Sequence, residues 1–369
     1  MNVIKAVFRG SRAGQQIAAN IYSSKAAADT AAGRSEGGRK GLTLVLAHAN
    51  GFHKELWEPT LQRLFGHQER NAGGGGWRID RAVALDGYNH GDSAVMNRES
   101  IGGEESSPWF LNARDIIAVV GQLPPPLGGG SHGVVGVGHS WGASSLLLAE
   151  IMAPLTFSAL IITDPVLFTE PNGNDKVREM TMRRRSAWPD LDAAIKYFVP
   201  HPFFGSWDKR ILDLYIKHGL ETVAKTTTTA VAVAADGAAT PSASGSQREQ
   251  LVLKCRPANE GAVYAGSYRA SPHAAHNLWK IQCPTAFLTG EESQLAAPSH
   301  IQHLIRPMSD VQHVVMKDAG HLLVLENPDQ TADHYAAFLD SFVPRLAATN
   351  NIGGSSSSNP RPSTPAANL

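Results

Sequence analysis

The stretch that decides the fold is residues 132–152, HGVVGVGHSWGASSLLLAEIM, which contains GHSWG at 138–142. The pattern G-x-S-x-G sets a serine between two glycines, as a sharp turn from a strand into a helix requires. This chain matches the pattern three times, at GRSEG (33–37), GGSHG (129–133) and GHSWG. The neighbouring residues therefore have to separate a catalytic serine from a chance glycine turn.

Ser140 alone among the three has a strand pattern before it and a helical pattern after it. GVVGVG precedes Ser140 and GASSLLLAEIM follows it, with small Ala143 where the helix has to approach the sheet. Ser35 lies in a polar, glycine-rich insert, and Ser131 follows a Pro/Gly run and precedes a strand. A strand-turn-helix context exposes the hydroxyl and points helix-start N–H groups at an oxyanion. We therefore predict that Ser140 is a nucleophile.

Strand and helix patterns alternate around Ser140, in the order typical of a mostly parallel sheet with helices on both faces. Eight strands are predicted at 3–8, 17–22, 42–48, 78–86, 133–138, 157–163, 284–290 and 311–317. Helices are predicted at 55–67, 108–122, 141–152, 299–306 and 328–342. The predicted fold class is α/β, with an eight-stranded sheet.

One gap between strands, from Asp164 to Pro284, is far longer than a helical crossover needs. We expect an inserted helical cap there, with helices near 174–187, 190–199 and 207–219. The predicted organisation is a first core part, a cap with a low-complexity insert, a second core part and a disordered tail, at 1–165, 166–280, 281–348 and 349–369.

Composition narrows the classes of function. The chain has 369 residues, and 33 basic residues balance 33 acidic ones, so the formal net charge of zero argues against nucleic acid as a partner. No apolar window reaches the ~18 residues of a transmembrane helix, and MNVIKAVFRGSRAG lacks the apolar run of a secretory signal. Two cysteines, Cys255 and Cys283, are too few for a disulfide framework and lack zinc-site spacing.

A serine hydroxyl needs a base that takes its proton and a third group that orients the base. His321, in DAGHLLVLENP, follows the last predicted strand and lies at the carboxyl edge of the sheet, so we predict that it is the base. The alternative for His321 is a loop histidine bonded to a carbonyl group.

Other histidines are expected to be structural. His139, beside Ser140 in the turn, is expected to pack rather than react. The pairs His300/His303 and His273/His276 have a spacing that could hold a metal, but no carboxylate motif joins them, so solvated helix faces are expected. The predicted chemistry requires neither a metal nor an organic cofactor.

The acid that orients His321 has two candidate sources. Asp164 ends the strand after the Ser140 helix, in SALIITDPVLF, and its other role would be to hold the turn at Pro165. Glu291 and Glu292, in TGEESQL, are the alternative acids. Geometry favours Asp164.

An oxyanion hole needs two donors. One is expected to be the backbone N–H of Trp141, the residue after the nucleophile. The second is expected in HANGFHKELW (48–57), at the backbone of Asn50, with Ala49 and Gly51 as neighbouring alternatives.

The segments GHSWGA, HANGFHKELW, LDGYNHGDS, WFLNARD, TDPVLF and DAGHLL together resemble the α/β-hydrolase superfamily. More narrowly, they are similar to its fungal peroxisomal branch of lipases, toxin-pathway hydrolases and acyl-CoA thioesterases. The resemblance covers nearly all of the core and is weak in the cap. It implies the α/β-hydrolase fold and a triad of Ser140, Asp164 and His321. In many α/β-hydrolases the acid instead follows the seventh strand, where this chain has Ser293.

The function that these motifs predict is serine hydrolysis of an acyl ester or acyl-CoA thioester. The resemblance implies fungal lipid or toxin and polyketide metabolism. Alternatives are a peroxisomal lipase or carboxylesterase, an acyltransferase, a carbon–carbon hydrolase, or a binding protein with a dead site. The ending Ala367-Asn368-Leu369 resembles the peroxisomal S-K-L signal, which predicts a peroxisomal import receptor as partner, with the cytoplasm as the alternative location.

Two sets of side chains in the expected cap bear on the substrate. Arg183, Arg184 and Arg185 either bind CoA phosphates or form a solvated helix end. Four aromatic residues either line an acyl pocket or pack between cap and core: Phe198, Phe203, Phe204 and Trp207.

Overall fold

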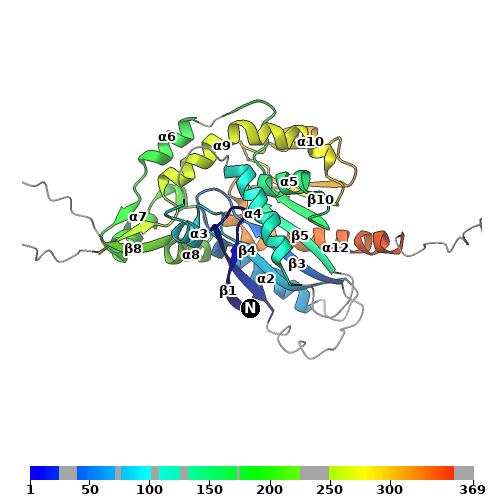
Figure 1. The fold of residues 1–369 in the computed structure, drawn as a ribbon, viewed down its shortest axis with the longest axis horizontal. Helices are drawn as coiled ribbons and strands as arrows, with labels where there is room; N and C mark the ends of the chain where they lie inside the picture. Colours follow the sequence, from blue (N-terminus) through cyan, green and yellow to red (C-terminus); the bar gives the residue numbers. More distant parts are fainter. Residues whose placement is uncertain are drawn as a thin grey trace, which may run out of the picture.

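The computed structural model describes residues 1–24, 40–70, 76–100, 108–124, 132–172, 175–224 and 249–352. An eight-stranded sheet runs through the centre of the molecule (Figure 1) in the order β1-β2-β4-β3-β5-β6-β10-β11. Its strands are β1 (Asn2–Arg9), β2 (Gln16–Ser23), β3 (Lys40–Ala47), β4 (Trp77–Leu85), β5 (His132–His139), β6 (Ala159–Thr163), β10 (Thr285–Gly290) and β11 (Val311–Met316). The β1–β2 and β2–β4 pairs are antiparallel and the other pairs are parallel, which confirms the predicted mostly parallel sheet.

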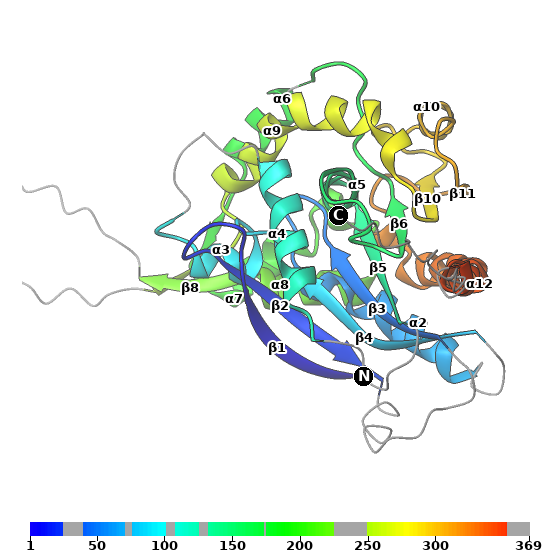
Figure 2. The same cartoon turned by 45° about the vertical axis from the view of Figure 1, so that its right-hand side comes forward.

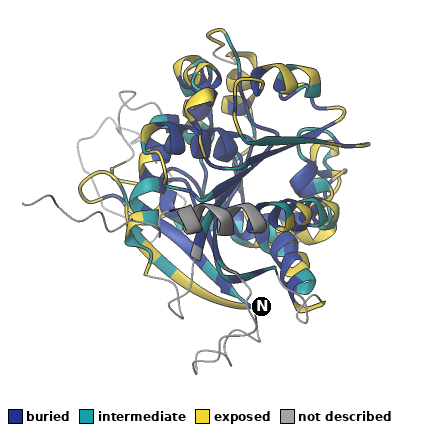
Figure 3. Ribbon diagram, turned by 90° about the vertical axis from the view of Figure 1, so that its right-hand side faces the viewer, coloured by how far each residue is buried: buried dark blue, intermediate teal, exposed yellow. Residues whose placement is uncertain are grey.

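Helices cover both faces of this sheet (Figure 2). One face carries α4 (Pro108–Gln122), α5 (Trp141–Met152) and α10 (Pro298–Leu304), and the other carries α2 (Glu58–Arg70) and α12 (Pro328–Ile352). Strand β3 shows that both faces of the sheet are buried. Leu44 and Leu46 belong to the hydrophobic core on one face, and Val45 belongs to the core on the other face. The central strands are accordingly buried, whereas the edge strand β1 is exposed (Figure 3).

The chain between β6 and β10 contains helices at each place where the sequence predicts one. These are α6 (Asp175–Arg183), α7 (Leu191–Phe198) and α8 (Lys209–Gly219). It also contains an unexpected antiparallel sheet of order β7-β9-β8, formed by β7 (Ala187–Trp188), β8 (Leu220–Ala224) and β9 (Glu249–Leu253). These strands are short, and β7 has only two residues, so no alternating pattern marks it in the sequence.

Helix α9 (Pro257–His276) was also not predicted, because Gly261, Gly266 and Pro272 interrupt its helical pattern. The small residues allow close packing instead. A Cβ atom at Gly266 would lie 2.8 Å from Cδ of Pro108 at the start of α4. Trp109 Nε1 also donates a 2.8 Å hydrogen bond to the carbonyl of Val263. Helix α9 therefore joins the segment after β6 to the core helices.

Three short helices complete the loops near the sheet edge: η2 (Lys54–Trp57), α3 (Gly91–Met96) and α11 (Leu323–Glu326). Two further single turns lie at η3 (Pro202–Phe204) and η4 (Leu278–Lys280). At the other end of the chain, α12 continues to Ile352, beyond the expected start of the tail at Thr349. Among the described residues, no helix is both long and apolar enough to cross a membrane.

Candidate active site

Ser140 occupies a strained turn between β5 and α5. Its backbone angles are φ 53° and ψ −118°, so a residue with a side chain adopts a conformation that normally favours glycine. The glycines beside it are required by close approach. A Cβ atom at Gly142 would collide with the carbonyl oxygen of Ala47, and one at Gly138 would lie 2.6 Å from Cα of Ala143. The turn thus presents Ser140 at the first turn of α5, against the end of β3.

The structure brings His321 and Asp164 to Ser140 in a continuous hydrogen-bonded chain. His321 Nε2 lies 2.9 Å from Ser140 Oγ, and His321 Nδ1 lies 2.7 Å from Asp164 Oδ1. Asp164 is fully buried, whereas the side chain of His321 is 20% exposed. Each residue follows a parallel strand at the same edge of the sheet, which explains how three distant segments meet.

The carboxylate of Asp164 is held by two further donors. Asp164 follows β6 with a positive φ of 43°. Its Oδ2 accepts a 2.8 Å hydrogen bond from the backbone N–H of Gly290, and its Oδ1 accepts a 2.6 Å bond from Ser293 Oγ. These bonds leave Oδ1 facing His321. The bond from Ser293 was not predicted from the sequence. The signal that could have indicated it is the serine at the position where many α/β-hydrolases carry the acid.

The alternative acids do not reach His321. Glu291 and Glu292 follow β10 as exposed residues. Oε2 of Glu291 accepts a 3.4 Å hydrogen bond from the backbone N–H of Asp318. In this loop Ser293 faces Asp164 instead, because Ser293 is buried whereas Glu291 and Glu292 are exposed.

His139 is buried beside His321 and packs rather than facing solvent. Its Nε2 donates a 2.8 Å hydrogen bond to the backbone carbonyl of His321. Burial, together with the neighbouring His321 ring, lowers the pKa of His139 to about 3. The ring therefore stays neutral and fixes the backbone of the His321 loop.

The expected oxyanion loop lies against the turn at Ser140. Gly142 abuts the carbonyls of Ala47 and His48, which places the loop after β3 beside the start of α5. The side chain of Asn50 donates a 3.1 Å bond to the carbonyl of Glu260 in α9. The backbone N–H of Gly51 donates a 2.9 Å bond to His90 Nε2, so this amide is already occupied. Of the three predicted donors on this loop, Ala49 and Asn50 remain.

One histidine of each sequence pair bonds to a backbone carbonyl. His300 Nε2 donates to Leu167 at 2.8 Å and His276 Nε2 donates to Thr169 at 2.9 Å. His273 instead packs edge-on against Phe110. In the described part of the chain, no group of three or more His, Cys, Asp or Glu side chains is arranged to hold a metal ion.

The three consecutive arginines at 183–185, where α6 ends, have different environments. Arg183 is exposed, and Arg185 donates to the carbonyl of Ala187 and lies over the rings of Trp188 and Tyr197. Arg184 turns inward and forms a 2.5 Å ion pair with Glu260. The arginines therefore do not form a shared phosphate-binding cluster.

Most of the predicted aromatic residues are buried in one cluster. Phe198, Phe204 and Trp207 pack with Ala49 and Phe52 of the loop after β3, as well as with Leu325 near His321, whereas Phe203 is 50% exposed. This cluster fixes the segment after β6 against the two loops that carry the site.

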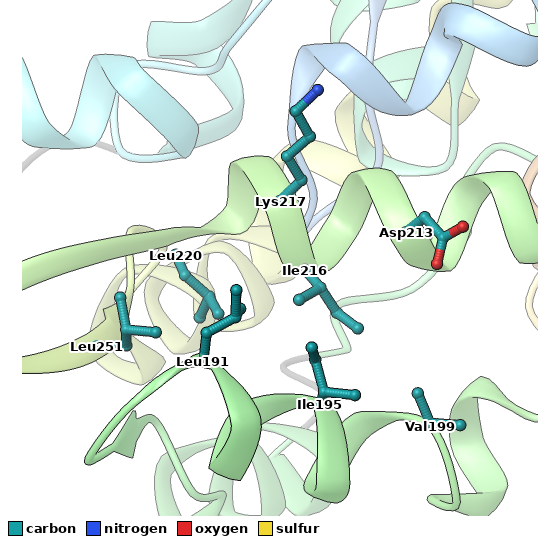
Figure 4. A pocket seen from close by; sticks show the side chains of 8 residues that line it. All are labelled: Leu191, Ile195, Val199, Asp213, Ile216, Lys217, Leu220 and Leu251. Carbon is teal, nitrogen blue, oxygen red and sulfur yellow. The ribbon is translucent and has the colours of Figure 1, made fainter.

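A separate apolar pocket of about 460 Å³ lies between α7 and α8 (Figure 4). Leu191 and Ile195 of α7, and Val199 just after it, face Ile216 and Leu220, whereas Lys217 points away. Its lining includes neither Ser140 nor His321, so it is distinct from the site around these two residues. Ser35, Ser131 and the ending Ala367-Asn368-Leu369 lie outside the described residues.

Comparison with known proteins agrees with this architecture. Residues 44–334 match the alpha/beta hydrolase family, and the chain belongs to that family. It is similar to the peroxisomal membrane protein LPX1 of Saccharomyces cerevisiae, at 25% identity over 82% of this chain and 76% of LPX1. The crystal structure of peroxisomal Lpx1 superposes with a TM-score of 0.70 at 20% identity, covering 100% of this chain and 92% of that one.

Two other fungal proteins are similar over shorter regions. The abhydrolase domain-containing protein ACTT2 of Alternaria alternata is 27% identical over 56% of this chain and 83% of ACTT2. The type I acyl-CoA thioesterase mpaH of Penicillium roqueforti is 28% identical over 48% of this chain and 39% of mpaH. The resemblance read from the sequence motifs is therefore confirmed at the level of the family and these relatives.

Proposed function

We propose that this hydrolase uses Ser140 as a nucleophile in acyl transfer to water. Ser140 Oγ attacks the acyl carbonyl while His321 takes its proton, and His321 then protonates the leaving alcohol or thiol. Water, deprotonated by His321, releases the acid and regenerates Ser140. The observation that carries this proposal is the Ser140–His321–Asp164 chain, with its 2.9 Å and 2.7 Å contacts at the start of a helix.

Asp164 keeps the Nδ1–H tautomer of His321 and stabilises the imidazolium that forms during attack. The backbone N–H groups of Trp141 and Asn50 stabilise the oxyanion, and the N–H of Ala49 is the alternative to that of Asn50. Residues 166–280 act as a cap, because their aromatic cluster contacts both the oxyanion loop and the His321 loop. Each of these roles can be tested on its own residue.

The substrate that we propose is an acyl-CoA thioester or an acyl ester in fungal lipid or secondary metabolism. The likeness to the acyl-CoA thioesterase mpaH supports the thioester. A peroxisomal location, supported by the likeness to LPX1, would be checked by imaging a fluorescent fusion with and without the last three residues.

The experiment that separates these substrates is a kinetic panel of acyl-CoAs, p-nitrophenyl esters and triglycerides. Free acids and acyl-transfer products are both quantified, and Ser140→Ala serves as the matched control. We expect hydrolysis with the highest kcat/KM for an acyl-CoA, and loss of turnover in Ser140→Ala. A preference for esters would replace the thioesterase assignment with a carboxylesterase or lipase, and transfer products would indicate an acyltransferase.

A further inference from the structure

Two buried histidines outside the triad connect the loops that follow β3 and β4. His48 lies directly after β3, and its Nε2 accepts a 3.0 Å hydrogen bond from the backbone N–H of Gly87 in the loop after β4. His90 lies in the loop after β4, and its Nε2 accepts a 2.9 Å bond from the backbone N–H of Gly51 in the loop after β3. Each loop therefore supplies a histidine acceptor for an amide of the other loop.

The other nitrogen of each ring fixes its tautomer. His48 Nδ1 donates to the carbonyl of Ala49 at 2.7 Å. His90 Nδ1 lies 2.7 Å from Asn89 Oδ1, which is the acceptor end of that amide because Asn89 Nδ2 donates to the carbonyl of Asn259. Both rings thus carry the proton on Nδ1 and direct an Nε2 lone pair at a backbone amide.

Burial keeps both rings in this neutral form. Burial lowers the pKa of His48 and of His90, and for His90 the neighbouring His48 ring and the charge of Arg184 lower it further. Nε2 of His90 also lies 3.0 Å from Asn50 Oδ1. Since that nitrogen accepts the hydrogen of Gly51, this contact joins two acceptors, and Asn50 is held by its bond to Glu260.

The same rings pack against Trp141, whose amide is the other proposed oxyanion donor. The centroid of His90 lies 4.9 Å from that of Trp141, and the centroid of His48 lies 6.0 Å from it. The two histidine rings are 5.2 Å apart. Gly87 leaves room for the indole, because a Cβ atom there would lie 2.6 Å from Trp141 Cη2. The two loops and Trp141 thus form one interlocked unit.

We propose that His48 and His90 are positioning residues that form a reciprocal brace across the oxyanion hole. The brace fixes the Ala49–Gly51 segment relative to Trp141 and so sets the separation of the two amide donors. This inference rests on the proposed function of Ser140. Neither histidine touches the reacting atoms, so each acts through the loop whose amide it accepts.

The test replaces each histidine by phenylalanine, which removes the ring acceptor and has a side chain of similar size. With p-nitrophenyl butyrate, we expect His48→Phe and His90→Phe to lower kcat by about 10- to 100-fold, because displaced donors lose part of the 10²–10³-fold effect of a complete donor. KM should change by less than about 3-fold, because the oxyanion forms only in the transition state. Inhibition by butylboronic acid, which forms a tetrahedral adduct on serine, should weaken by the same factor as kcat.

Conservative and double variants separate the brace from general packing. His90→Gln and His48→Gln keep a side-chain acceptor and should recover most of the lost kcat. The double variant His48→Phe/His90→Phe should lose little more than either single variant, because both act on one unit. His313→Phe, on β11, is the matched control and should retain the wild-type kcat.

Either of two results would overturn the brace. These are a wild-type kcat in folded His48→Phe and His90→Phe variants, or an effect confined to KM. If a phenylalanine variant does not fold, His48→Met or His90→Met takes its place and must show the same loss. Absence of Ser140-dependent turnover in the wild-type protein would overturn the proposed function itself, which distinguishes the two failures.

Discussion

At the scale of single residues, the acid of the proposed triad is placed by a neighbour that carries no charge. Oδ1 of Asp164 accepts from Ser293 at 2.6 Å and from His321 at 2.7 Å. A hydrogen bond to a charged group is worth about 1.5–3 kcal/mol, so Ser293 holds Asp164 in one orientation. The loops after β6 and β10 therefore meet at Oδ1 of Asp164, the atom that contacts His321 Nδ1.

This convergence predicts that the acid can be moved. Asp164→Ala should lower kcat by about 10⁴-fold, because His321 loses its tautomer control. Adding Ser293→Asp to that variant should restore kcat at least about 10-fold, since Ser293 lies against Oδ1 of Asp164 and a carboxylate there is expected to take the place of that oxygen beside His321 Nδ1. Rates are measured with p-nitrophenyl butyrate.

The control for acid relocation is Asp164→Ala/Ser293→Ala, which has no carboxylate in either loop and should not recover. Glu291→Gln and Glu292→Gln should keep the wild-type kcat, because these carboxylates lie at the surface. A large loss in either glutamine variant, with Asp164→Asn still active, would move the acid to the loop after β10.

At the scale of elements, the turn between β5 and α5 depends on a close approach to β3. A Cβ atom at Gly142 would meet the carbonyl oxygen of Ala47, which is part of a buried strand and cannot move aside. Gly121, near the end of α4, has no atom within 4 Å of the corresponding position. The two glycines thus differ in what an added methyl group meets.

We expect Gly142→Ala to lower the free energy of unfolding by roughly 3 kcal/mol, at the upper end of the cost of overpacking. Gly121→Ala should leave it unchanged or raise it by up to about 1 kcal/mol, because alanine favours a helix over glycine. Urea denaturation of both variants measures the difference. Equal stabilities would show that the turn relaxes without cost.

The elements also show what the sequence can predict. The eight strands and the positions of Ser140, Asp164 and His321 relative to them follow from local patterns, because each residue directly follows a strand or lies in the loop after one. Helix α9 could not be predicted, because glycine has a low helix propensity. Gly266 is present in this helix because it allows close packing against Pro108. The contributions of Ser293 and of His48 and His90 depend on partners distant in the sequence, which no local pattern records.

At the scale of the whole molecule, buried neutral histidines make the free energy of unfolding depend on pH. The pKa of His139 is lowered to about 3 by burial and by His321, whereas an unfolded chain has a value near 6.5. Between these values the unfolded state binds a proton that the folded state does not. The free energy of unfolding should therefore decrease as pH falls from about 6.5 toward about 3.

The expected contribution of His139 is a slope of ~1 kcal/mol per pH unit in that window, which His139→Gln should remove. His48 and His90 add to the wild-type slope, because burial lowers the pKa of each ring as well. Urea denaturation at several pH values between 4 and 7 measures the slopes. The same slope in the wild type and in His139→Gln would contradict this origin.

The central claim is that Ser140 is the nucleophile of an acyl hydrolase, and labelling with a fluorophosphonate tests it most directly. The wild-type protein should gain one phosphonate, located by peptide mass spectrometry on Ser140, with parallel loss of turnover. His321→Ala should label far more slowly and Ser140→Ala should not label at all. Labelling of another residue, or an unlabelled wild-type protein that still turns over acyl substrate, would contradict the account.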